Sequence, residues 1–253
     1  MLFSCLSISS LFVNLILNVS SLFRKTLQIV DCNFSLIYIL ASFTNITVSA
    51  CSSSTCIGTE TPYRTSIVTV LYPFDGNTND LSGYATGVAL GSSTPSFSSE
   101  GYVNEAIRLI ASSQQYVQIP SIDLTNRSFT IQAWLYTTTL SSSSDYGIFC
   151  QCDVNSICLA LNLRNARFTL SFDSMNANNN TLIGSSIVTS SNWVHVSVVY
   201  DATLFQQQIY VDGKIDALSN GIVSAYQGVS SVSTTATIGR SQSFSHGTTY
   251  FDR

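Results

Sequence analysis

Acidic and amide residues in one short stretch are the first that could do chemistry. Asp75, Asn77 and Asp80 lie in the sequence DGNTND and place three side-chain oxygens within six residues. Such oxygens are ligands of hard cations, although Ca²⁺ takes about six to eight of them. The same residue types also form turns by hydrogen-bonding to their own backbone. Turn formation is therefore the favoured interpretation, and a cation site at Asp75, Asn77 and Asp80 is the alternative.

Three cysteines form a second reactive group. Cys150, Cys152 and Cys158 lie within nine residues, and the last two flank the loop DVNSI between two strand-like runs. Thiolates at this spacing can ligate zinc, but a structural zinc site needs about four nitrogen or sulfur ligands and no histidine lies nearby. Because the N-terminus indicates export, a Cys152–Cys158 disulfide is favoured, with a second bridge between Cys51 and Cys56. Cys150 is then left over.

Residues that hydrolytic enzymes use are not arranged for catalysis. His195 lies among strand residues, which favours a structural role, and nothing beside His246 suggests a catalytic partner. No Gly-x-Ser-x-Gly motif occurs. The only glutamates, Glu60, Glu100 and Glu105, do not form the carboxylate pair on one strand that glycoside hydrolysis requires. We expect no enzymatic activity.

The charge balance argues against nucleic acid as a partner. Lysine and arginine number 10 against 14 acidic residues, the net charge is −4, and Lys25 and Lys214 are the only lysines. Binding to nucleic acid depends on clustered basic side chains that neutralise phosphates. With only 9% charged residues, the surface must consist largely of hydroxyl and amide side chains, as is usual in secreted proteins.

The first fifty residues are predicted to be an apolar leader, and two interpretations of it stay open. In the first, it is a signal peptide whose small residues at 48–50 suit cleavage before Cys51. In the second, two apolar stretches span a membrane with Arg24-Lys25 on the cytoplasmic side. A wrongly assigned gene start is a third possibility. Both targeting interpretations place the rest of the chain outside the cytosol.

The remaining chain divides into two parts. Residues 51–65 are rich in serine and threonine and are expected to be a linker, and residues 66–253 are expected to form one domain. Glycosylation sequons at Asn126 and Asn179 lie in polar, turn-like stretches of that domain, which also agrees with export.

Alternation of apolar and polar residues predicts strands throughout the domain. The clearest case is the stretch Asn192 to Lys214, where one face of a strand carries Val194, Val196, Val198 and Tyr200, and the other carries Trp193, His195, Ser197 and Val199. Asp212-Gly213 supplies the residues that a tight type I′ hairpin requires. Further strands are expected at Ile67 to Tyr72, Ala106 to Ile110, Gln115 to Ile119, Phe129 to Tyr136, Tyr146 to Cys150, Cys158 to Leu163, Arg167 to Phe172 and Ser185 to Val188.

Many short strands separated by Gly, Asn and Ser turns indicate an all-β fold, a two-sheet antiparallel jelly-roll sandwich. No segment of ten or more residues in the domain has a helical period. Aromatic residues are frequent, and most are expected in the core. Four tyrosines beside Gly, Ser or Pro are candidates for stacking on sugars at the rim: Tyr63, Tyr84, Tyr146 and Tyr226.

Six sequence words occur in an order that matches a known family. They are LYPFDGNTNDLSG, YVQIP, SFTIQAWLY, WVHVSVVYD, IYVDGK and ATIGR. In this order the chain, from about residue 67 onward, resembles the laminin G-like jelly rolls of the concanavalin A-like lectin/glucanase superfamily. The resemblance implies a possible Ca²⁺ site at Asp75, Asn77 and Asp80. It also implies a closing strand that this sequence does not contain, so we expect the domain to lack its last strand and the chain to be a fragment.

The resemblance also implies a function. We expect a non-catalytic extracellular recognition or adhesion domain that binds a glycan or a glycosylated or matrix protein, secreted or anchored with the domain outside. Contact with a membrane is expected only through the N-terminal segment. The alternatives are a structural spacer in a larger adhesive protein and a glycosidase-related domain. A fold alone does not supply a function.

Overall fold

The computed structural model describes residues 69–141, 143–152, 158–173, 180–219, 235–243 and 247–251, together with the backbone of three short strands nearer the N-terminus. These residues form strands and loops with one helical turn, the 3-10 helix η1 (Ala111–Ser113). Among them, no helix has the length and apolar character needed to cross a membrane.

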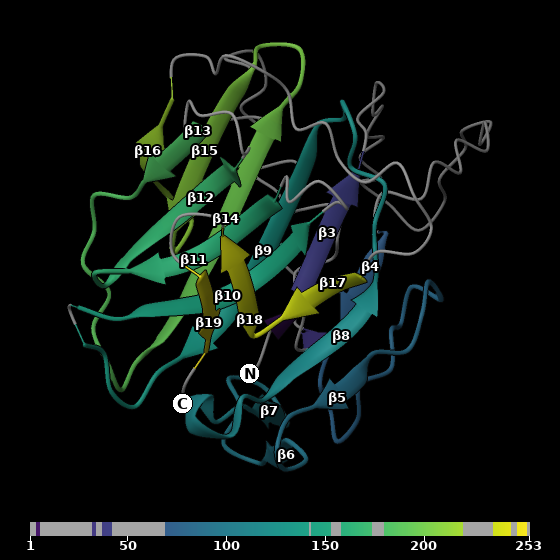
Figure 1. Cartoon of the computed structure of the whole chain (residues 1–253). Helices are drawn as coiled ribbons and strands as arrows, with labels where there is room; N and C mark the ends of the chain where they lie inside the picture. The colour runs from purple at the N-terminus through teal and green to yellow at the C-terminus, as the bar shows by residue number, and fades with distance from the viewer. Residues whose placement is uncertain are drawn as a thin grey trace, which may run out of the picture.

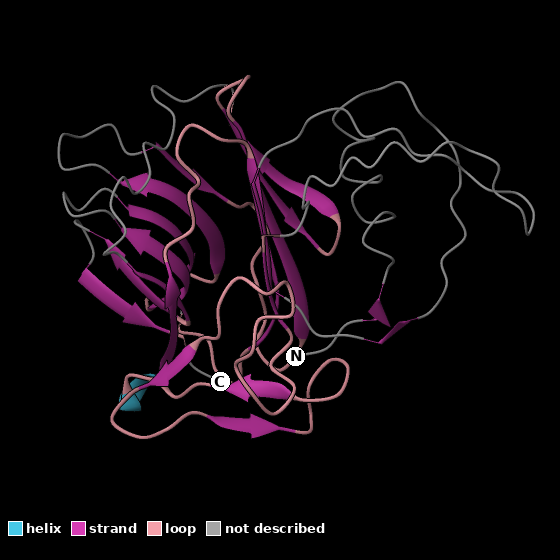
Figure 2. Ribbon diagram, turned by 90° about the vertical axis from the view of Figure 1, so that its right-hand side faces the viewer, coloured by secondary structure: helices cyan, strands magenta, loops and turns pink. Residues whose placement is uncertain are grey.

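Two antiparallel sheets stack face to face, as Figure 2 shows in edge view. The first has six strands in the order β16-β15-β14-β9-β3-β4. Their bounds are β3 Ile37–Ala41, β4 Val70–Tyr72, β9 Phe129–Tyr136, β14 Trp193–Asp201, β15 Gln206–Val211 and β16 Lys214–Leu218.

The second sheet has seven strands in the order β13-β12-β11-β10-β17-β8-β5 (Figure 1). Their bounds are β5 Val88–Leu90, β8 Tyr116–Pro120, β10 Asp145–Cys152, β11 Cys158–Arg164, β12 Arg167–Asp173, β13 Asn180–Ile183 and β17 Thr235–Ile238. The predicted all-β jelly-roll sandwich is confirmed.

Three two-stranded ladders complete the described structure. They are β1 (Ser4–Cys5) with β2 (Cys32–Asn33), β6 (Ser96–Ser98) with β7 (Ala106–Arg108), and β18 (Arg240–Ser243) with β19 (Gly247–Tyr250). The β18–β19 hairpin packs against β10, and β18 also packs against β11 (Figure 1). Gly147 permits this contact, because a Cβ atom there would lie 2.6 Å from the carbonyl carbon of Arg240.

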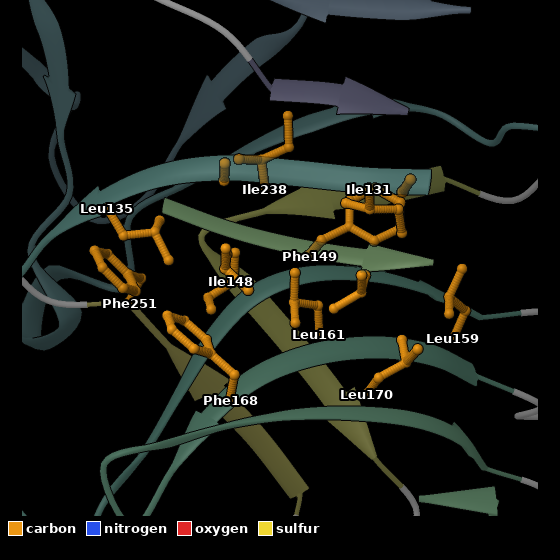
Figure 3. Close-up of a cluster of buried hydrophobic side chains, with 14 of the residues drawn as sticks. Ile131, Leu135, Ile148, Phe149, Leu159, Leu161, Phe168, Leu170, Ile238 and Phe251 are labelled. Carbon is orange, nitrogen blue, oxygen red and sulfur yellow. The ribbon is translucent and has the colours of Figure 1, made fainter. Parts of the chain in front are cut away.

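The core fills the space between the sheets (Figure 3). In the pairing of β9 with β14, Ala133 lies opposite Val196, and Ile131 lies opposite Val198. Since each of these four side chains is at most 1% exposed, this face of both strands lies in the core. Bounds predicted for Phe129 to Tyr136 match β9 at both ends.

The opposite face of β14 is covered as well. His195, Ser197 and Val199, which alternate with the inward residues, are all buried. Two-faced burial explains why this strand carries valine and a histidine on its second face rather than charged residues.

The hairpin that joins β15 to β16 has the predicted turn. Asp212 and Gly213 both have positive φ, 48° and 75°, and Val211 pairs with Lys214. Asp212 also accepts the His195 backbone N–H at 2.9 Å, so the turn is tied to the neighbouring strand.

One predicted strand was wrong. The strand expected at Ser185 to Val188 is instead β13, at Asn180–Ile183, and Ile187 is 66% exposed. Gly184 donates its N–H to the Phe168 carbonyl at the end of the ladder, and the Val188 N–H bonds to Ala166 in a loop. Only Val188 in that segment is buried, so its apolar residues do not define a strand face.

Strand β3 lies inside the range predicted to be the leader. Its backbone pairs with β9 on one side and with β4 on the other, so the described β4 is not left unpaired on that side. A strand in this place completes the ladder of β9, because among the described strands only β3 pairs with the edge of β9 that faces away from β14.

Candidate functional site

The opening loop uses its polar groups to build turns. Both Asp80 oxygens accept hydrogen bonds: Oδ1 from the backbone N–H of Leu71 at 2.6 Å and of Ser82 at 3.0 Å, and Oδ2 from the Ser82 hydroxyl at 2.7 Å and from the Tyr84 N–H. Burial by itself would raise the pKa of Asp80, but the hydrogen bonds from Ser82, Leu71 and Tyr84 hold it below its ordinary value.

The other two predicted ligands also face protein groups. Asn77 donates to the Asp75 carbonyl at 2.8 Å, and its Oδ1 accepts the Asn79 N–H at 2.8 Å. Asp75 accepts from Asn104 at 3.4 Å and from the Glu105 N–H at 3.3 Å. These contacts are those of turn-forming residues. Calcium binding at Asp75, Asn77 and Asp80 stays a prediction.

The cysteines form the predicted bridge between β10 and β11. Cys152 and Cys158 are directly opposite in the ladder and are joined by a disulfide. The buried Cys150 sulfur lies 3.5 Å from Cys152 and hydrogen-bonds the Gln242 backbone of β18. Within the described residues, these three cysteines are the one group of three His, Cys, Asp or Glu side chains close enough to share a metal, and the disulfide commits two of the sulfurs. Cys51 and Cys56 lie outside the described residues.

The two sequons stay predictions. Asn126 is exposed in a turn with φ 51°, where a glycan has room. Asn179 lies outside the described residues.

His195 is buried, and desolvation lowers its pKa to about 4, although the Asp212 charge acts in the opposite direction. The imidazole is therefore neutral at physiological pH. Its ring lies 5.3 Å from that of Trp134, in a packed environment that agrees with the structural role inferred from the sequence.

Four aromatic side chains gather beside this histidine, and we call them the aromatic patch: Tyr102, Trp134, Tyr136 and Trp193. Tyr102 comes from the loop between β6 and β7 and stacks on Trp134 of β9, with ring centroids 3.8 Å apart and an interplanar angle of 16°. Trp193 of β14 meets Tyr102 edge-on at 6.1 Å and Tyr136 at 5.4 Å. Tyr102 is 42% exposed and the other three rings are half-buried, so the patch has a surface open to solvent.

A small hollow lies at the same end of the sandwich. It has a volume of about 50 Å³ and is lined by Trp134, Tyr136 and Trp193 on one side and by Gly239 and Phe251 on another. Ligand pockets usually measure about 300 Å³ or more. A sugar can therefore rest on the patch but cannot enter the hollow.

The structure corrects one of the predicted rim tyrosines. Tyr146 is buried, and its hydroxyl accepts the Ser141 N–H at 3.0 Å, so it belongs to the core. Tyr84 is 41% exposed, and Tyr63 and Tyr226 lie outside the described residues.

The sequence contained a signal for the patch that was not used. Trp134 and Tyr136 alternate with the inward residues of β9, and Trp193 does so in β14, so these rings had to share the outer face. Tyr136 lies directly opposite Trp193 in the ladder. No local signal places Tyr102 over Trp134, because Tyr102 lies in the β6–β7 loop and Trp134 lies in β9, a distant segment of the chain.

Comparison with solved structures finds several domains of similar fold. Domain 4 of AbnA, a GH43 extracellular arabinanase from Geobacillus stearothermophilus solved in complex with arabinotriose, aligns with a TM-score of 0.50 and 15% identity over 72% of this chain and 87% of that one. Domains LG4-5 of the mouse laminin alpha1 chain align with a TM-score of 0.41 and 16% identity over 55% of this chain, which spans only 34% of theirs. The CBM40 of Ruminococcus gnavus IT-sialidase, bound to alpha2,3 sialyllactose, aligns with a TM-score of 0.37 and 16% identity over 49% and 67% of the two chains.

No curated protein matches the sequence. A laminin G-like family model, described as the concanavalin A-like lectin/glucanases superfamily, matches residues 111–252, more than half of the chain. The match includes β9 and β14, which position the aromatic patch, and it confirms the resemblance found in the sequence. The chain belongs to the concanavalin A-like lectin/glucanases superfamily.

Proposed function

We propose that this chain is a non-catalytic carbohydrate-binding domain whose aromatic patch stacks on the rings of an extracellular glycan. The observation that carries this proposal is the exposed Tyr102 ring lying parallel on Trp134. An aromatic ring presents a flat apolar face with negative charge density, which suits the C–H face of a sugar. Trp134 holds Tyr102 from below, so stacking on a ligand orders little that is not already fixed.

The relatives support this choice of ligand. The arabinanase domain was solved with a bound oligosaccharide, and its fold extends over 72% of this chain. Absence of a carboxylate pair on one strand supports a binding role over hydrolysis. The Cys152–Cys158 disulfide supports an extracellular location, because disulfides persist in oxidising compartments.

A glycan array probed with the full oxidised chain, followed by calorimetric titration of its best ligand, tests the proposal. We expect Tyr102→Ala to weaken binding at least tenfold, because one stacked ring is lost from the contact. Phe205→Ala is the matched control, since Phe205 is an aromatic residue that is 45% exposed and lies outside the patch. Equal affinities for the wild type and the Tyr102 variant, or an array without any binding, would rule the proposal out and favour a structural spacer.

We also propose that Ca²⁺ binds to the opening loop. A cation bound only by the native state must raise the unfolding midpoint. Thermal unfolding in calcium and in EDTA therefore tests it: a rise that is lost in Asp75→Ala supports a site there. Identical midpoints would leave Asp75, Asn77 and Asp80 as turn formers.

The domain limits are a proposal too. We infer a leader at 1–50, a linker at 51–65 and the jelly roll at 66–253. Strand β3 lies within the first of these ranges and pairs with β9 in the sheet. If β3 is an integral strand, Ile39→Pro removes a ladder donor and lowers the free energy of unfolding by at least about 2 kcal/mol, whereas Ile39→Ala keeps the backbone donor. An unchanged stability in urea for the proline variant would place the boundary after β3.

A further inference from the structure

A second group of side chains, distinct from the aromatic patch, lies next to the hollow. We call it the arginine triad: Arg240 at the start of β18, Tyr116 at the start of β8 and Tyr250 at the end of β19. The Arg240 guanidinium carbon lies 4.8 Å from the Tyr116 ring centroid and 5.9 Å from that of Tyr250. The two ring centroids are 6.3 Å apart. These distances describe a compact triangle, so the rings do not enclose the guanidinium from opposite sides.

Within the part of the chain that the structure describes, no residue accepts a hydrogen bond from the Arg240 side chain. Among the described residues, three arginines are half-buried: Arg164, Arg167 and Arg240. Arg164 donates to Asp145 at 2.8 Å, and Arg167 donates to the carbonyls of Gly184 and Ser185. Arg240 takes part in neither described ion pair, and its buried Nε has no hydrogen-bond partner.

The described contacts of Arg240 leave its hydrogen-bond donors without acceptors. A guanidinium carries five N–H donors in a planar fork and cannot lose its charge. The tyrosine rings attract the cation through their faces, but they supply no acceptor oxygen in that geometry. A desolvated donor without an acceptor is costly, so the fold retains a charged group for which the described residues provide no counterpart.

We propose that the arginine triad is an anion subsite that selects acidic glycans, with Arg240 holding the carboxylate or sulfate group of a charged sugar. The planar fork can donate two parallel hydrogen bonds to such a group. Tyr116 and Tyr250 offer ring faces for the sugar beside it. The inference rests on the proposed function and adds the ligand class to it.

Position in the fold links the two sites. Gly239 and Phe251, which line the hollow, are the chain neighbours of Arg240 and Tyr250. Trp134 and Trp193 of the aromatic patch line the same hollow. Both groups therefore adjoin residues that line the hollow, the patch from β9 and β14 of the six-stranded sheet and the triad from β8 of the seven-stranded sheet and the β18–β19 hairpin.

The test compares three probes on the full oxidised chain by calorimetry: an oligogalacturonide, a neutral galactose oligosaccharide of the same length and a sulfated one. We expect the wild type to bind one acidic probe at least tenfold more tightly than the neutral probe. A preference for the oligogalacturonide identifies carboxylate as the ligand group, and a preference for the sulfated probe identifies sulfate. Rising salt should reduce the preference, because it screens partly exposed charges.

Arg240→Gln should remove this preference, so that the acidic probes bind no more tightly than the neutral probe. Arg127→Gln is the control, because Arg127 is exposed and already paired with Asp123 at 3.0 Å. If the glutamine variant fails to fold, Arg240→Lys takes its place, and the preference should fall several-fold because the fork is lost.

Two kinds of failure are distinguishable. Binding of the neutral probe with no acidic preference, or a preference that persists in Arg240→Gln, overturns the anion subsite alone and leaves Arg240 as a brace between β8 and the hairpin. Binding of no probe overturns both the proposed function and the inference that rests on it.

Discussion

The opening loop and the arginine triad each contain one partly buried charged side chain, and the two differ in what surrounds it. Asp80 accepts hydrogen bonds from four backbone N–H groups and a hydroxyl, so the loop uses the full hydrogen-bonding capacity of this carboxylate. Arg240 contacts two aromatic rings and, within the described residues, no acceptor. A charged residue that stands out in the sequence can therefore be fully used by the fold, whereas a less conspicuous one has no acceptor among the described residues.

Removing the Asp80 carboxylate is expected to have the largest effect on stability. Asp80→Ala leaves several loop N–H groups without their acceptor, and we expect the free energy of unfolding in urea to fall by about 3 kcal/mol. The stabilisation is present at neutral pH and is lost as pH falls through the lowered folded pKa, since the unfolded carboxyl titrates near 3.8. Asn77→Ala, which removes one exposed turn contact, is the control and should cost less than about 1 kcal/mol. A small effect at Asp80 would contradict the view that the fold uses this loop fully.

Stability measured against pH extends the comparison to His195, a buried side chain on the outer face of β14. Because its pKa in the folded state is about 4 and its ordinary value is 6.5, the unfolded state takes up a proton first as pH falls. Stability should be level above about pH 7 and fall by about 2 kcal/mol by pH 5 through this group. Comparing the wild type with His195→Gln cancels the other titrating groups, and parallel pH profiles of the two proteins would show that His195 does not contribute.

Opening the disulfide should have a comparable or smaller effect. The bridge closes a short loop at the tip of β10 and β11, so its loss, in Cys152→Ser with Cys158→Ser, should cost about 2 kcal/mol or less. Thermal unfolding of the double variant measures it. Failure of the double variant to fold would show that the bridge holds the seven-stranded sheet and not only its rim.

The smallest change in stability is expected at Arg240. Arg240→Met removes two cation–π contacts but no hydrogen bond of its side chain, so unfolding in urea should shift by less than about 1 kcal/mol in either direction. This result, set beside a large loss at Asp80, would sharpen the distinction between the two regions. A loss of stability as large as that of Asp80→Ala would contradict the distinction between the two regions, because Arg240 would then be a main support of the β18–β19 hairpin.

Local patterns predicted much of the fold and little of the site. The alternation in Phe129 to Tyr136 defined both ends of β9, and Asp212-Gly213 defined the hairpin, because each depends on neighbouring residues only. The Cys152–Cys158 bridge was predictable for the same reason, since its ends lie in adjacent strands joined by one short loop. Sequence order also identified the family.

The candidate sites depend on contacts between distant segments. Tyr102 meets Trp134 only because the β6–β7 loop lies over the end of β9, and Arg240 meets Tyr116 only because the chain leaves the seven-stranded sheet at the end of β17, which pairs with β8. No period or turn signal in either segment specifies such a placement. The oxygen-rich loop was the more conspicuous motif, yet its side chains accept hydrogen bonds from the loop itself, from Leu71 and from the distant Asn104 and Glu105, which sequence alone could not show.

Gly147 determines how freely this end of the molecule can vary. A single methyl group there would collide with the backbone of Arg240 and Ser241. A saturation library would therefore be expected to reject nearly every substitution at Gly147, a residue that touches no proposed ligand, while tolerating exchanges at Arg240 or Tyr102. Related sequences can diverge at those two positions, provided that this one glycine keeps the β18–β19 hairpin packed on β10.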